Sequence, residues 1–239
     1  MTQKILAKLM SFAGSNKLGL FKIAIASSFL VIVPQGQVKA ALLTVANNSF
    51  ETPIVTNPTG FISSTGSVGG WTFTGGQQGF ANPTIGQSSG NSWYGPSPTL
   101  PNGNQVAWSN GGTISQTLSA TLQANTVYTL GAFVGNRIGL NFPGYNIQLY
   151  AGGTLLASNN SVTPADGTFA PVTASYTSGI SVTPGQALEI RLTSLSGFQG
   201  QTNFDNITLD AASIPEPSAI LGLLGFGLLG IASKLRQKQ

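Results

Sequence analysis

Few side chains in this chain could do chemistry, because its 239 residues include no histidine and no cysteine. This composition excludes Ser-His-Asp and Cys-His nucleophiles, zinc sites built on thiolate or imidazole, and disulfide bonds. Carboxylates, hydroxyls, amides and aromatic faces remain. The acidic residues are Glu51, Asp166, Glu189, Asp205, Asp210 and Glu216.

These carboxylates do not form a recognisable pair of general acid and general base. Asp166 precedes Gly167 and is typical of a turn residue, while Asp210 ends an apolar-alternating stretch close to the C-terminal segment. A glycoside hydrolase or lyase, which can work with two carboxylates, is the enzymatic alternative. We therefore predict a protein that is not an enzyme and has no catalytic residues.

Residues 1–40 have the order of a secretory signal peptide. Lysines come first, then the apolar run 23–33, then small residues that end at Ala40. Signal peptidase is expected to cut between Ala40 and Ala41. An uncleaved N-terminal anchor is the alternative, although the apolar run is shorter than the ~20 residues that span a bilayer.

Residues 213–239 combine a short motif, an apolar segment and a basic end. The apolar segment, 219–232, is short for a transmembrane helix, and cations after it favour a cytoplasmic tail. The motif residues are Pro215, Glu216 and Pro217, and the basic residues are Lys234, Arg236 and Lys238.

This C-terminal arrangement resembles the PEP-CTERM protein-sorting signal. The resemblance implies an exported protein whose membrane-anchored precursor is processed by an exosortase, and a destination at the cell surface or in the extracellular matrix. It also implies an association with extracellular polysaccharide. An ordinary tail anchor preceded by a chance Pro-Glu-Pro is the alternative.

The segment 41–212 is long enough for one domain, and its pattern is that of an all-β protein. Short β-branched and aromatic stretches alternate with Gly, Pro, Asn and Asp turn signals, which favours an antiparallel jelly-roll β-sandwich. Residues 47–105 are less regular and are expected to hold one or two strands. The predicted strands are 71–74, 105–109, 113–118, 127–134, 145–150, 154–158, 171–177, 188–193 and 203–209.

The opening Asn47–Pro53 and the closing Phe204–Leu209 resemble galactose-binding-like jelly rolls, which include carbohydrate-binding modules. In that family the opening Glu and the closing Asp often hold a structural calcium ion, which implies Glu51 and Asp205 as ligands here. The alternation of Asp205 with Ile207 and Leu209 predicts a side chain toward the core, where a carboxylate needs a cation or hydrogen-bond donors. The alternative is that Asp205 accepts backbone N–H groups and Glu51 is solvated.

Aromatic residues in loops are the candidates for binding sugar, because the C–H faces of sugar rings stack on aromatic rings. The candidate residues for carbohydrate binding are Trp93, Tyr94, Phe142 and Tyr145. The alternative is a hydrophobic loop folded onto its own sandwich.

The charge of the chain, +4 at pH 7, comes from its two targeting segments. Residues 41–213 hold only two basic residues, Arg137 and Arg191, against five acidic ones. Nucleic acid is thus disfavoured as a partner. We predict an exported, non-catalytic surface protein that binds or organises extracellular polysaccharide, an adhesive or structural surface protein being a further alternative.

Overall fold

The structure, a computed structural model, describes residues 40–86, 93–96, 98–195 and 200–215. All the regular elements in these ranges are β-strands. Within the same ranges, no helix has the length and apolar character needed to cross a bilayer. The predicted signal helix, and the transmembrane helix over 219–232, lie outside the described residues.

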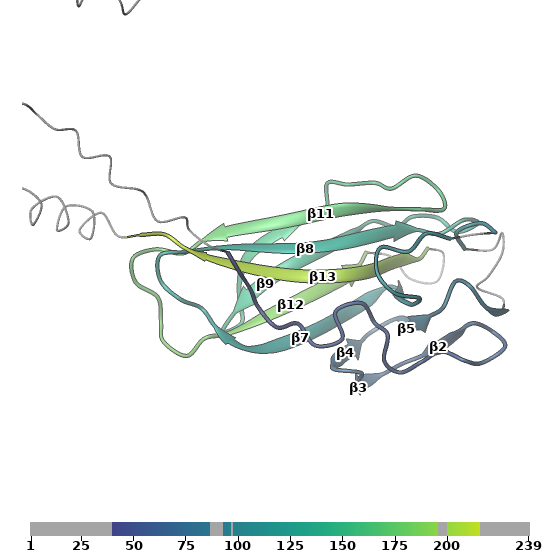
Figure 1. Cartoon of the computed structure of the whole chain (residues 1–239), viewed down its shortest axis with the longest axis horizontal. Helices are drawn as coiled ribbons and strands as arrows, with labels where there is room; N and C mark the ends of the chain where they lie inside the picture. Colours follow the sequence, from purple (N-terminus) through teal and green to yellow (C-terminus); the bar gives the residue numbers. More distant parts are fainter. Residues whose placement is uncertain (1–39, 87–92, 97, 196–199, 216–239) are drawn as a thin grey trace, which may run out of the picture. The chain divides into compact units, whose positions relative to one another are not determined.

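The described strands form two antiparallel sheets that pack face to face (Figure 1). The seven-stranded sheet has the order β11-β8-β13-β6-β5-β2, and β1 pairs with β13. Its strands are β1 (Ala41–Leu42), β2 (Phe61–Ser63), β5 (Gln77–Ala81), β6 (Val106–Asn110), β8 (Thr126–Asn136), β11 (Thr168–Thr177) and β13 (Thr202–Ser213).

The six-stranded sheet has the order β10-β9-β12-β7-β4-β3. Its strands are β3 (Gly66–Val68), β4 (Trp71–Thr74), β7 (Gly112–Thr121), β9 (Tyr145–Ala151), β10 (Thr154–Asn159) and β12 (Ala187–Ser194). The all-β antiparallel sandwich predicted from the sequence is confirmed.

Alternation of buried and exposed residues explains why these segments are strands. In β12, Leu188, Ile190 and Leu192 are fully buried, whereas Glu189 and Arg191 point to the other face and form an ion pair at 2.8 Å. Apolar side chains from both sheets meet in this way and fill one core between them.

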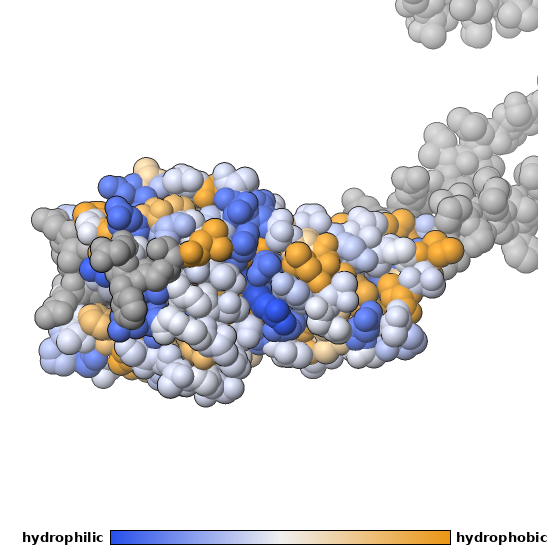
Figure 2. Space-filling model, turned by 180° about the vertical axis from the view of Figure 1, so that it is seen from behind, coloured by the Kyte–Doolittle hydropathy of each residue, from blue (hydrophilic) through white to orange (hydrophobic). Residues whose placement is uncertain are grey.

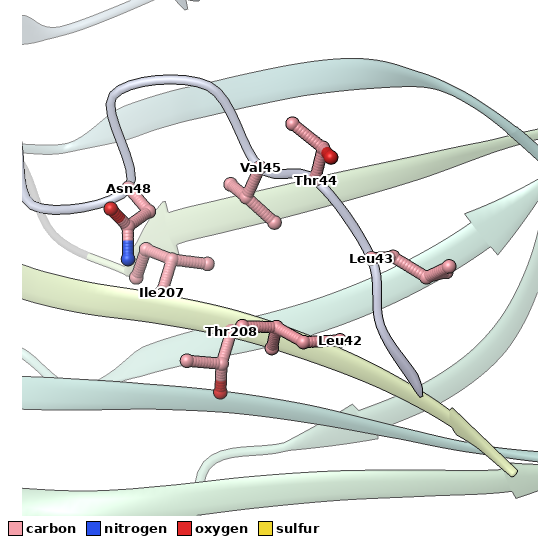
Figure 3. A pocket seen from close by; sticks show the side chains of 7 residues that line it. All are labelled: Leu42, Leu43, Thr44, Val45, Asn48, Ile207 and Thr208. Carbon is pink, nitrogen blue, oxygen red and sulfur yellow. The ribbon is translucent and has the colours of Figure 1, made fainter. Parts of the chain in front are cut away.

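The segment after residue 40 crosses the sandwich beside β13. Its backbone bonds to β13 through Leu43 N–H, which donates to Leu209 O at 2.8 Å, and through Asn48 O, which accepts from Ile207 N–H at 2.8 Å. A shallow pocket of about 210 Å³ lies between the two (Figure 3). It is lined by Leu42, Leu43, Thr44, Val45, Asn48, Ile207 and Thr208.

Each of the nine predicted strands falls on an observed strand, but the region 47–105 holds more strands than expected. Besides β4 it contains β2, β3 and β5. These strands are three to five residues long and rich in Gly, Ser and Gln, so they lack the β-branched pattern that the prediction used.

The side chain of Asp205 faces the opposite way from the prediction. The pairing of β13 with β8 shifts register between Asp205 and Thr208, and Asn206 has a φ of 49°. This β-bulge breaks the alternation. Phe204 and Ile207 both point into the core, so Asp205 lies on the outer face of the seven-stranded sheet.

Candidate active site

A second hydrophobic cluster lies on the outer face of the seven-stranded sheet, away from the main core. The register places Trp108 of β6 opposite Gly79 of β5 and Asn203 of β13 on this face. Trp93, Tyr94 and Leu100, which are described residues between β5 and β6, pack onto it. The cluster contains Ala81, Trp93, Tyr94, Val106 and Trp108, with Phe61, Leu100 and Phe169 against it. We call the cluster, together with the polar residues Arg137, Asn203 and Asp205, the outer-face site.

Aromatic contacts hold the loop to the sheet. Trp93 stacks on Phe61 with ring centroids 6.3 Å apart, and Phe61 meets Trp108 edge-on at 5.8 Å. Tyr94 stacks on Phe169 of β11 at 4.5 Å. Offset and edge-on pairs of this kind stabilise packing beyond the area they bury. The loop is therefore a packed cover over the sheet.

Gly135 of β8 makes room for this cover. A Cβ atom at this position would overlap the Tyr94 hydroxyl and the Phe169 ring. The Tyr94 hydroxyl lies against Gly135, and Gly135 pairs with Asn203 of the neighbouring strand β13. The hydroxyl is therefore close to β13.

Several polar atoms of the outer-face site are buried without a hydrogen-bond partner among the described residues. They are Tyr94 Oη, Asn203 Oδ1 and Arg137 Nε. Leaving such an atom unpaired costs about 1–3 kcal/mol. Burial also raises the pKa of Tyr94 well above its ordinary value, an effect that the nearby Arg137 charge opposes and that of Asp205 reinforces. The Tyr94 hydroxyl is thus close enough to Arg137 and Asp205 for their charges to act on it.

Asp205 is the carboxyl group of the outer-face site, and it is 0% exposed. Its Oδ2 accepts the N–H of Asn102 at 2.9 Å, and its Oδ1 accepts the N–H of Asn206 at 2.6 Å. Burial raises the pKa of Asp205 to about 8; the two N–H groups lower it and the charge of Glu51 raises it. The carboxyl is therefore mostly protonated at neutral pH.

Glu51 and Asp205, the predicted calcium ligands, face the same loop. Glu51 Oε1 accepts the N–H groups of Asn104 and Gln105, each at 2.8 Å. In the described part of the chain no three acidic side chains stand together. Calcium takes six to eight oxygen ligands, so loop carbonyls and water would have to supply the others. The ion stays a prediction, and both carboxylates have backbone N–H donors without it.

The structure does not bring the four predicted carbohydrate-binding aromatics together. Trp93 and Tyr94 are 2% and 8% exposed in the outer-face site. Tyr145 is fully buried in the main core, with the half-buried Phe142 6.1 Å from it. The surface in Figure 2 shows apolar residues dispersed among polar ones. These rings pack against their own domain, as in the alternative of a loop folded onto the sandwich.

The other predicted residues lie away from the outer-face site or outside the description. Ala40 is exposed and Ala41 begins β1. Pro215 is exposed after β13, and the predicted sorting residues Glu216, Pro217, Lys234, Arg236 and Lys238 lie outside the described residues.

Sequence reasoning did not single out two polar residues of the outer-face site, Arg137 and Asn203. A signal for Arg137 was present, because it is one of only two basic residues in 41–213. Asn203 carries no comparable signal, because its position next to Trp108 follows from strand pairing.

Comparison with known proteins gives two family matches. Residues 41–210 match the HpiC1 cyclase model, and residues 213–237 match the PEP-CTERM protein-sorting motif. No curated protein matches the chain. The sorting motif confirms the resemblance seen in the sequence and marks an exported protein whose precursor is processed by an exosortase.

Among solved structures, a Stig cyclase from Fischerella sp. TAU has a TM-score of 0.63 and 26% identity, over 74% of this chain and 100% of the other. That cyclase was solved with (3Z)-3-(1-methyl-2-pyrrolidinylidene)-3H-indole. A Fischerella sp. TAU cyclase solved with 4-(1H-indol-3-yl)butan-2-one has a TM-score of 0.61 at the same identity and coverage. Neighbours also include the xylan-binding CBM22-1 domain of Paenibacillus barcinonensis Xyn10C, with a TM-score of 0.41 and 13% identity over 67% of this chain and 100% of the other.

The cyclase match overturns the prediction that the protein is not an enzyme. That prediction searched for a histidine, a cysteine or a pair of carboxylates, and so passed over a single buried carboxyl group. The HpiC1 model spans the whole described sandwich up to residue 210, outer-face site included. The chain therefore belongs to the HpiC1-like cyclase family.

Proposed function

We propose that the outer-face site is the active site of a cyclase that acts on an apolar, unsaturated molecule with an aromatic ring, and that Asp205 is its proton donor. The observation that carries the proposal is a fully buried carboxyl group on an aromatic-covered sheet face, within the segment that matches the cyclase family. The indole compounds bound to the Fischerella cyclases support an aromatic substrate.

Asp205 suits the role of an acid because it keeps its proton at neutral pH. Its pKa of about 8 results mainly from burial, and general acids work best when their pKa lies near the working pH. Asn102 and Asn206 donate N–H groups to the carboxyl oxygens, so they hold the group in place and can stabilise the carboxylate left after proton transfer.

The reaction we propose balances without an oxidant, a reductant or a cofactor. Asp205 gives its proton to one carbon of an alkene, and the π-electrons of the alkene form the new C–H bond. The aromatic ring of the substrate attacks the resulting carbocation, which closes the ring. The proton then lost from the attacked ring carbon returns to the Asp205 carboxylate, so the product is an isomer of the substrate.

Aromatic side chains share the outer face of the sheet with Asp205 and suit a cationic intermediate. The faces of Trp and Tyr rings attract cations, and the attraction is stronger where water is excluded. Trp108 is 4% exposed on the sheet, and Tyr94 lies in the cover above it. Tyr94 is only 8% exposed over this face, so the proposal requires Tyr94 to move off the sheet when a substrate enters.

Turnover of a simple probe tests this function. The probe is 3-(4-methylpent-3-enyl)-1H-indole, whose protonation and closure at indole C2 give a tetrahydrocarbazole of equal mass. The exported protein should form this isomer, detected by chromatography and mass spectrometry, and Asp205→Asn should reduce the rate at least 100-fold. Asp210→Asn, a change on the same strand outside the site, is the matched control. Equal turnover by wild type and Asp205→Asn would refute the role of Asp205.

A further inference from the structure

The two arginines of the exported domain have different surroundings. Arg191 forms a two-point contact with Glu189, with N···O distances of 2.8 and 2.9 Å, and lies over the Tyr150 ring on the six-stranded sheet. Arg137 follows β8 at the outer-face site, and no acidic group among the described residues lies within 4.0 Å of it. In a segment with five acidic residues, an unpaired arginine calls for an explanation.

The position of Arg137 is fixed by neutral groups. Its guanidinium carbon lies 4.1 Å from the centroid of the Trp93 ring, and its Nη1 donates to Gln201 Oε1 at 3.3 Å. Gln201 in turn donates through Nε2 to Asn110 Oδ1 at 2.9 Å. The next residue, Ile138, donates its N–H to Trp93 O at 2.9 Å. These contacts orient the guanidinium but leave its charge uncompensated.

The Arg137 guanidinium is partly desolvated in this arrangement, which is unfavourable for a charged group. Arg137 Nε is buried and has no hydrogen-bond partner in the described part of the chain, and burial lowers the pKa of Arg137 below its ordinary value. Asp166, in the turn before β11, accepts a hydrogen bond from Asn136 Nδ2 at 3.0 Å instead of pairing with Arg137. An anion beside Arg137 would offset the desolvation of the guanidinium.

We infer that Arg137 is an anion-binding subsite of the outer-face site, and that the natural substrate carries a carboxylate. The inference rests on the proposed function and adds a substrate class to it. A guanidinium fork binds a carboxylate through two parallel hydrogen bonds, and the Trp93 face keeps the fork planar and oriented. The aromatic cluster takes the apolar body of the same molecule.

The sheet register sets the length of such a substrate. Asp205 lies opposite Phe133 of β8, and Arg137 comes four residues later, directly after the end of that strand. Four residues of a strand span about 13 Å, and the long arginine side chain can shorten this reach. The carboxylate and the reacting carbon of the substrate are therefore several bonds apart, at opposite ends of the molecule.

Two ligands of the same shape test the inference. They are 4-(1H-indol-3-yl)butan-2-one and 3-(1H-indol-3-yl)propanoate. The second has a carboxylate oxygen where the first has a methyl group. Isothermal titration calorimetry on the exported protein at pH 7 should show that the propanoate binds at least tenfold more tightly than the ketone. Arg137→Gln should remove this preference, and Arg137→Lys should keep part of it because the charge remains.

Arg191→Gln is the matched control, because it removes the other arginine on the opposite sheet, and it should keep the tenfold preference. Thermal melting of each variant shows that the chain is folded. Equal affinities of wild type for ketone and propanoate, or an unchanged preference in Arg137→Gln, would overturn the carboxylate subsite and leave the proposed function standing. Failure of wild type to bind either ligand would count against the outer-face site as a whole, and so against both.

Discussion

Replacing Asp205 by asparagine should change how the stability of the domain depends on pH. In the folded protein the pKa of Asp205 is raised to about 8 from its ordinary value of 3.8. Between these two pH values the unfolded chain has lost the proton and the folded chain keeps it. The folded state binds the additional proton, so wild-type stability falls as pH rises.

The size of this effect follows from the same two values. One bound proton changes the free energy of unfolding by about 1.4 kcal/mol per pH unit. Over the whole pH range between the two pKa values of Asp205, the change is about 6 kcal/mol at most. Between pH 5 and pH 7 the wild type should lose about 2.7 kcal/mol relative to Asp205→Asn. The asparagine side chain of the variant cannot accept both N–H groups as well as a carboxyl group does. This lowers the free energy of unfolding of the variant by the same amount at every pH and does not change its dependence on pH.

Urea unfolding followed by tryptophan fluorescence measures this difference, because Trp71, Trp93 and Trp108 are all buried. The comparison of the two proteins at each pH cancels the titration of the other groups. Asp210→Asn controls for the removal of one negative charge from β13. Parallel stability curves for wild type and Asp205→Asn from pH 5 to pH 7 would show an ionised carboxyl in the folded state and refute the reasoning.

Three other predictions follow from the site and the sorting motif. Calcium bound by Glu51 and Asp205 should raise the melting temperature more at pH 9 than at pH 6, because the ion and the proton compete for Asp205. An equal calcium-induced rise in the melting temperature of Glu51→Gln would argue against this site. Gly135→Ala should lower the free energy of unfolding by about 1–3 kcal/mol in urea titrations, because its methyl group meets the aromatic cover, and an unchanged stability would contradict the packing described. Alanines in place of Pro215–Pro217 should leave unprocessed precursor in the membrane fraction, and normal processing would contradict the role of the motif.

The sandwich was predictable because its long strands alternate. Leu188, Ile190 and Leu192 share a face in the sequence as they do in the structure. The short strands β2, β3 and β5 were not predictable in this way, since glycine, serine and glutamine carry little β signal and these strands depend on pairing with their neighbours.

The outer-face site was less predictable, because a single bulge determines it. Strict alternation sends Asp205 toward the core with Ile207, but the register shift before Thr208 turns it outward. The sequence left two possibilities for Trp93, a sugar-binding loop or a loop folded onto its own sandwich, and the structure has the second. Gly135, whose missing side chain admits that loop, looks in the sequence like any other glycine within a strand.

Deuterium transfer tests the central claim, proton donation by Asp205, most directly. The exported protein, the alkenyl indole and D₂O are combined, and the product is analysed by NMR. Exchange of the Asp205 carboxyl with solvent predicts one deuterium on the chain carbon next to the newly bonded carbon, in wild type and not in Asp205→Asn. Cyclised product from Asp205→Asn with the same label, or no cyclised product from wild type although the probe binds, would contradict the account.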